Sequence, residues 1–116
     1  MKNFVEPGDT IVVAAPANVN AGAGVLVGAI FGVAVTDALN GENVPIKTAG
    51  VFDLPKAASQ AWTQGARVYW DNAGGEATTV STGNYPIGVA TEDVAGGATD
   101  TIGRVRLDGI ATDVAA

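Results

Sequence analysis

IFGVAVTDALNG, residues 30–41, is matched later in the chain by a similar segment, PIGVATEDVAGG, residues 86–97. Self-similarity of this kind is typical of a duplicated structural unit. Two shorter pairs flank these segments in the same order: GDTIVV at 8–13 with GARVYW at 65–70, and AGVF at 49–52 with DGIA at 108–111. We therefore predict two copies of one β unit, over residues 8–52 and 65–111. The alternative is that Gly-Val-Ala recurs only because the chain is rich in these residues.

Short strands separated by turns surround the repeated segments. Runs of β-branched and aromatic residues alternate with clusters of Gly, Asn and Asp, which is the pattern of strands joined by tight turns. The cluster DNAGG at residues 71–75 lies between two such runs and predicts a hairpin. We expect strands near residues 10–15, 25–27, 30–36, 43–51, 67–71, 77–81, 87–91 and 102–111. The expected fold is mainly β, a compact small β-barrel or sandwich.

The two copies are joined by GVFDLPKAASQAWTQGARVYWD, residues 50–71, in which we predict one short α-helix at about residues 54–63. Asp53 can cap the first turn, Pro55 is tolerated there, and Gly65 can end the helix. Helical spacing puts five apolar residues on one face: Leu54, Ala57, Ala58, Ala61 and Trp62. A helix this short is not stable alone in water, so we expect it to pack on the β structure with Trp62 as its anchor.

Length and charge limit the possible classes of function. The 116 residues suit a single β domain, residues 1–116, in which residues 1–7 can form an N-terminal arm. The net charge of −6 argues against binding nucleic acid and against docking on anionic membranes. The N-terminus lacks the apolar core of a secretory signal, and the most apolar stretch, residues 22–35, is too short to span a bilayer.

The chain carries few residues suited to catalysis or ligand binding. It has no cysteine and no histidine, which excludes disulfides, Cys/His zinc sites, thiol nucleophiles and Ser-His-Asp triads. The carboxylate pairs Glu92 with Asp93 and Asp37 with Glu42 lie in glycine-rich loops, where solvated loop tips are the expected role. DNAGGE at residues 71–76 lacks the spacing of a calcium loop. The sequence thus predicts no catalytic residue, no cofactor and no metal site.

Arg104 and Arg106 alternate with Val105 and Leu107 in the last strand. Both arginines should lie on one strand face, with the apolar pair inward. They either pair with acids of this chain or form part of a contact with an acidic partner.

The chain resembles the DUF2190 family, small tailed-phage and prophage proteins regarded as capsid cement or decoration proteins. The similarity rests on MKNFVEPGDTI, GVLVGAIFGVA, GVFDLPKAASQAWTQGARVYWD, IGVA and GRVRLDG, which stand in the family's order over nearly the whole chain. The resemblance implies a structural protein, not an enzyme, that binds the outer surface of an assembled phage head and stabilises it. It further implies the major capsid protein as partner, a homotrimer, synthesis in the bacterial host cytoplasm and a final location on the virion.

Two other classes of function stay open at this point. One is a virion-displayed module that binds carbohydrate or a host surface, with Tyr85, Trp70 and Trp62 as stacking candidates. It predicts at least one fully exposed tryptophan. The other is a carboxylate-based hydrolase, which needs two converging acids in a cleft.

Overall fold

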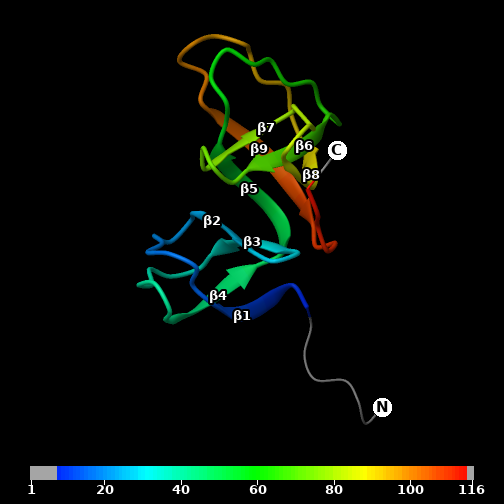
Figure 1. The fold of residues 1–116 in the computed structure, drawn as a ribbon. Coiled ribbons are helices and arrows are strands. Elements are labelled where there is room, and N and C mark those ends of the chain that lie inside the picture. The colour runs from blue at the N-terminus through cyan, green and yellow to red at the C-terminus, as the bar shows by residue number, and fades with distance from the viewer. Residues whose placement is uncertain (1–7, 115–116) are drawn as a thin grey trace, which may run out of the picture.

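The computed structural model describes residues 8–114, and these form nine β-strands in two antiparallel sheets (Figure 1). The first sheet contains β1 (Thr10–Ala14), β2 (Gly24–Val27), β3 (Ile30–Ala34) and β4 (Asn43–Lys47), in the order β1-β4-β3-β2. The second contains β5 (Ala49–Pro55), β6 (Arg67–Asp71), β7 (Glu76–Thr78), β8 (Tyr85–Ala90) and β9 (Ile102–Asp108), in the order β5-β9-β8-β6-β7. The predicted mainly β fold is confirmed, and the predicted N-terminal arm lies outside the described residues.

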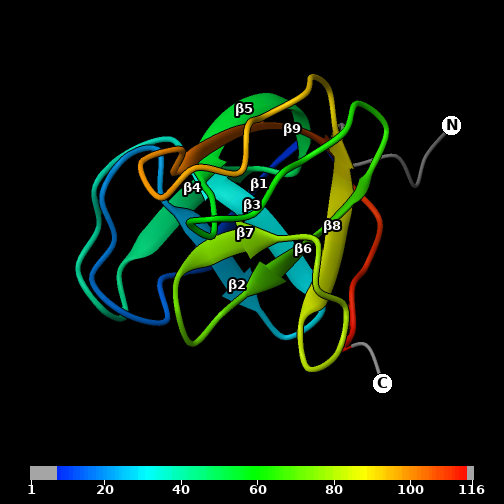
Figure 2. The same cartoon turned by 90° about the horizontal axis from the view of Figure 1, so that it is seen from above.

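The second sheet curves into a half-barrel. Just beyond β5, Lys56 forms a parallel bridge with Ala77 of β7. In this bridge the backbone N–H of Ala57 donates to the carbonyl oxygen of Ala77 at 2.9 Å. Seen from above, β5 and β9 therefore lie across from β6 and β7 (Figure 2). Curling a sheet in this way covers edge backbone that would otherwise stay unpaired.

The two sheets share one topology once β7 is set aside. β1 pairs with β4 as β5 pairs with β9, and β2 pairs with β3 as β6 pairs with β8. In the first sheet Val33 stands opposite Lys47, and in the second Val89 stands opposite Arg106. The similar segments 30–41 and 86–97 therefore contain equivalent central strands, β3 in the first sheet and β8 in the second.

The loops beyond these central strands also match. Val19 and Ala38 form an antiparallel bridge in the first half, and Trp62 and Val94 form one in the second. Both bridges consist of two backbone hydrogen bonds of 2.9–3.0 Å. The shared arrangement extends the correspondence from the strands to their connections.

An aspartate three residues after each GVA-containing strand holds the facing loop. Asp37 Oδ1 accepts a hydrogen bond from Ala21 N at 2.8 Å, and Asp93 Oδ1 accepts one from Gln64 N at 2.7 Å. We propose on this geometry that the chain is a duplication whose units are residues 8–48 and 49–108. These bounds differ from the predicted 8–52 and 65–111. GDTIVV corresponds to AGVFDL at 49–54 and not to GARVYW at 65–70, because the strand of GARVYW, β6, pairs as β2 does. In this division β7 is an insertion in the second unit.

The helix predicted at residues 54–63 is wrong, because the start of this segment pairs with β9 and the rest forms a loop with bridges from Lys56 to Ala77 and from Trp62 to Val94. Leu54 and Pro55 end β5, where they stand opposite Gly103 and Ile102. A seven-residue ladder to β9 satisfies the backbone of β5, whereas a helix of this length is marginal. Ser59 then has a φ of 58°, which breaks any right-handed helical run. Within residues 8–114 no helix has the length and apolarity needed to cross a membrane.

All eight predicted strand regions contain observed strands, and the larger differences are at residues 43–51, 77–81 and 102–111. The strand predicted at residues 77–81 is β7, which ends at Thr78. The strand predicted at residues 43–51 is two strands, β4 and β5, because the chain turns at Thr48 to leave one sheet and enter the other. The strand predicted at residues 102–111 ends at Asp108, before Gly109 with a φ of 69°. The hairpin predicted at residues 71–75 joins β6 to β7 and is confirmed.

Two hydrophobic clusters hold the sheets. The first sheet encloses its own small-residue cluster, formed by Ala15, Val25, Ala34, Ala38, Val44 and Ile46. The larger cluster fills the second sheet and includes Phe31 and Val33 from β3. The Phe31 ring packs on Trp70 with centroids 5.0 Å apart. Since one core spans both sheets, we propose that residues 8–114 form a single domain.

The two units use complementary residue sizes at one equivalent place. The first unit has Val19 in its loop bridge and Val44 opposite Val13. The second has Trp62 in its loop bridge and Gly103 opposite Leu54. A Cβ added at Gly103 would stand 2.7 Å from Trp62 Cη2, so the missing side chain makes room for the indole ring.

Candidate interaction surfaces

One face of the second sheet carries exposed arginines. β9 alternates strictly between exposed and buried residues, with Val105 and Leu107 buried and Arg104 and Arg106 exposed. The predicted face for the two arginines is confirmed. Period-two alternation puts both guanidinium groups on the outer side of the half-barrel.

Arg67 of β6 joins the same face, a placement that the sequence alone does not indicate. Val89 of β8 stands opposite Arg67 on one side and opposite Arg106 on the other. Val51 of β5 stands opposite Arg106 on its other side. The row Val51, Arg106, Val89 and Arg67 thus crosses four strands, and we call this row with Arg104 the arginine face.

The charges of the arginine face are unevenly paired. Arg104 Nε donates to Asp53 Oδ1 at 2.9 Å, and its Nη1 lies 3.8 Å from Glu92 Oε2. The hydrogen bond from Arg104 holds the pKa of Asp53 below its ordinary value of 3.8, and the same bond raises the pKa of Arg104. Within the described part of the chain, Arg67 and Arg106 have no carboxylate oxygen within 4.0 Å.

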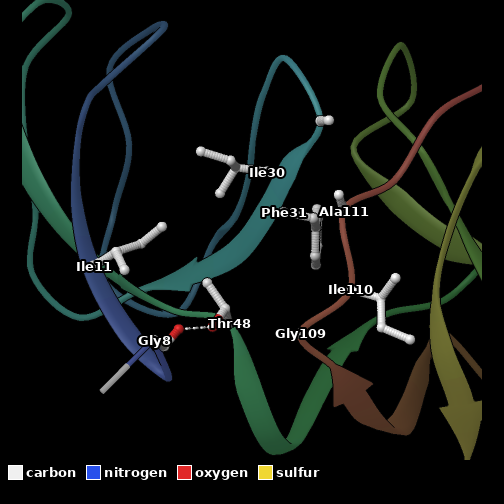
Figure 3. A pocket seen from close by; sticks show the side chains of 9 residues that line it. Gly8, Ile11, Ile30, Phe31, Thr48, Gly109, Ile110 and Ala111 are labelled. Carbon is white, nitrogen blue, oxygen red and sulfur yellow. Dashed lines mark hydrogen bonds between the residues drawn. The ribbon is translucent and has the colours of Figure 1, made fainter. Parts of the chain in front are cut away.

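An apolar notch of about 200 Å³ lies where the two units meet (Figure 3). Ile11 and Ile30 lie on the side of the first sheet, and residues 109–111 run along the other side. Thr48 Oγ1 donates to Gly8 O at 2.6 Å and closes the lower edge. The notch offers apolar surface and no convergent titratable groups, so it has the character of a contact surface and not of a catalytic cleft.

Three of the four paired carboxylates are turn caps, and the fourth is an ion-pair partner. As described above, Asp37 and Asp93 each accept a loop amide hydrogen, and Glu42 Oε1 accepts one from Leu39 N at 2.7 Å. Glu92 is the distant partner of Arg104. The prediction of solvated tips was therefore too simple, because these groups hold loops while staying exposed.

The calcium-like segment DNAGGE also forms a turn. Asp71 Oδ1 accepts a hydrogen bond from Gly74 N at 3.1 Å. Across residues 8–114 there is no group of three His, Cys, Asp or Glu side chains that could hold a metal ion.

The aromatic stacking candidates are mostly inside the fold. Trp62 and Trp70 are 2% and 3% exposed, and Tyr85 is half-buried on β8. The expected packing role of Trp62 is thus observed, although it lies on a loop bridge and not on a helix. A carbohydrate-binding module that needs an exposed tryptophan finds none within the described range.

Lys56 is a buried residue that sequence reasoning missed. Its side chain is 2% exposed, and Nζ donates to Ala57 O at 2.7 Å and to Gln60 O. Nζ also lies 5.9 Å from the centroid of the Trp62 ring. The equivalent residue of the first unit is Ala15, which shares its backbone bond to the facing loop. Lys56 therefore organises the loop after β5, and only its position between Pro55 and an alanine run could have signalled this.

A family model described as phage cement protein matches residues 5–107 of the chain. Comparisons with curated proteins and with solved structures found no match.

Proposed function

Because the chain belongs to the phage cement protein family, whose model matches residues 5–107, we propose that it binds the outer surface of an assembled tailed-phage head and stabilises it. The family match is the observation that carries this proposal. It supports a structural, capsid-associated role, and the attachment to a finished head is our extension of it.

The physical character of the chain supports the same role. A protein that ties shell subunits together needs a rigid body and exposed contact surface, and it needs no catalytic groups. Here every strand is hydrogen-bonded to a neighbour in one of two sheets, and the two sheets share one core. Many copies on one shell would add modest single contacts into a large total effect on shell stability.

We propose the major capsid protein as the direct partner and a homotrimer as the attached form. The trimer rests on the family resemblance. Several apolar side chains that a partner could cover are exposed, among them Val12, Leu39 and Ile110. We further propose that the protein acts without catalysis, nucleic acid or membrane, and that it is made in the host cytoplasm before joining the virion.

The test uses heads from a deletion strain of the phage or prophage that encodes the chain. We expect these heads to lack the protein, to bind it when it is added back, and to release DNA at a lower temperature without it. Heads of unchanged composition and unchanged heat resistance would contradict the proposal.

A further inference from the structure

The arginine face is the one exposed surface in the described structure where arginines gather. The chain has six Lys and Arg against twelve Asp and Glu, and all three of its arginines lie on this face. Resting on the proposed function, we infer that the arginine face docks on an acidic patch of the head's capsid protein, with Arg67 and Arg106 as the main contacts.

The geometry presents the two arginines as a fixed pair. They flank Val89 on strands two positions apart, which places their Cα atoms about 10 Å apart across the sheet. Both side chains are exposed, and neither is neutralised within residues 8–114. A guanidinium group binds a carboxylate through two parallel hydrogen bonds, so this pair fits a surface that carries two or more Asp or Glu side chains.

The neighbouring groups make the surface specific and not simply cationic. Arg104 is occupied by Asp53 and Glu92, and Asp108 follows Arg106 on the same strand face, where its carboxylate accepts from Ile110 N at 3.1 Å. Val51 is 54% exposed beside Arg106. A partner would therefore meet two free arginines next to an apolar patch, a combination typical of protein contacts.

The first unit shows what the equivalent face does there. The matching row is Thr10, Lys47, Val33 and Gly24, read from the same registers. Val33 is buried in the core shared with the second sheet, and a Cβ at Gly24 would stand 2.6 Å from the Trp70 ring. The first unit thus packs the Val33 and Gly24 end of this row against the second sheet, whereas the second unit leaves the equivalent end, at Arg67, exposed.

The residue differences between these two rows indicate the chemistry of the missing partner. The covered face carries a glycine under Trp70, and the open face carries Arg67 at that position. Glycine leaves room for the indole ring in the first unit, whereas the arginine side chain fills that space in the second unit and offers charge-assisted hydrogen bonds to a carboxylate. A polyphosphate is a worse occupant, since two free arginines on a chain of net charge −6 supply little counterion release.

The experiment compares two variants in binding to heads purified from the deletion strain. The double reversal Arg67→Glu with Arg106→Glu tests the face. The matched control is Lys47→Glu, because Lys47 is exposed and occupies in the first sheet the register position of Arg106. Thermal unfolding and solution mass of each variant are measured alongside co-sedimentation with heads.

We expect the double reversal to bind heads at least about tenfold more weakly. Lys47→Glu should stay within about twofold of the wild type. Wild-type binding should weaken as salt rises, and both variants should keep the wild-type mass and unfolding temperature. Equal binding of the double reversal would overturn the inference while leaving the proposed function intact. Loss of binding together with a reduced solution mass would also overturn it, because the face would then join copies of the chain. A wild type that does not bind heads contradicts the proposed function itself.

Discussion

The effects of mutating Trp62 and Gly103 on the free energy of unfolding should be strongly coupled. Trp62 is only 2% exposed, so Trp62→Val replaces a buried indole ring with a much smaller isopropyl group and should cost about 3–5 kcal/mol of unfolding free energy. Gly103→Val places a side chain where a Cβ alone would be 2.7 Å from Trp62 Cη2, and overpacking of this kind costs about 1–3 kcal/mol.

The double variant reproduces the pair that the first unit already uses, Val19 with Val44. If the two sites were independent, their costs would add to about 4–8 kcal/mol. Because the valine side chain at position 103 fills space that the indole ring vacates, we expect the double variant to lose about 2–4 kcal/mol, a coupling of at least about 2 kcal/mol. The remaining loss includes the bond from Trp62 Nε1 to Gln60 Oε1, 2.8 Å in the wild type.

Urea unfolding of the four proteins in this cycle, followed by circular dichroism, measures the coupling. The control pairs Trp62→Val with Ile110→Ala, because Ile110 is 70% exposed and should add independently. Additive losses for Trp62 and Gly103 would refute both the size-exchange argument and the structural equivalence of the two units.

Three further changes probe contacts outside this pair. Lys56→Met should lower the free energy of unfolding in urea by about 2–4 kcal/mol, because the carbonyl oxygens of Ala57 and Gln60 lose their buried donor. An unchanged free energy of unfolding would show that Lys56 does not stabilise this loop. The pKa of Asp53 in the folded protein lies below its ordinary value of 3.8, so the ion pair with Arg104 stabilises the fold fully above about pH 3.8 and is lost as the pH falls through the folded-state pKa. Asp53→Asn removes this titration and should therefore make the stability fall less steeply in acid. Identical acid unfolding profiles of wild type and variant would contradict this assignment. The Thr112 hydroxyl donates to Pro86 O at 2.6 Å, and the backbone amide of the same residue donates to Ala29 O in the first unit. Thr112→Val removes the hydroxyl bond, so it should cost about 1–2 kcal/mol of unfolding free energy and speed hydrogen exchange of the amide at position 112. Unchanged exchange would contradict a role for this residue in joining the two units.

The strand pattern and the family could be predicted from the sequence, but the pairing between strands could not. The alternation in β9 and the glycine-rich turn after Asp71 are local signals, and the structure confirms both. The helix prediction at residues 54–63 was wrong because the apolar spacing of this segment suits a helix locally. The start of the segment instead joins the ladder between β5 and β9, which pairs residues about fifty positions apart and leaves no local signal. Propensity gives way to tertiary pairing in such segments.

The candidate surface shows the same limit. Arg104 and Arg106 could be placed on one face from their spacing, because that inference needs only the period of a strand. Arg67 could not, since its position depends on the order of β6, β8 and β9 and on which residue faces Val89. The burial of Lys56 also depends on closure of the second sheet through Ala77, which no local pattern encodes.

The most direct test of the central claim is the temperature at which heads from the deletion strain release their DNA, with and without the purified protein. We predict that added protein binds these heads to saturation and raises the release temperature to that of heads from the parent phage. Saturation binding with no rise, or no binding at all, would contradict a cement function.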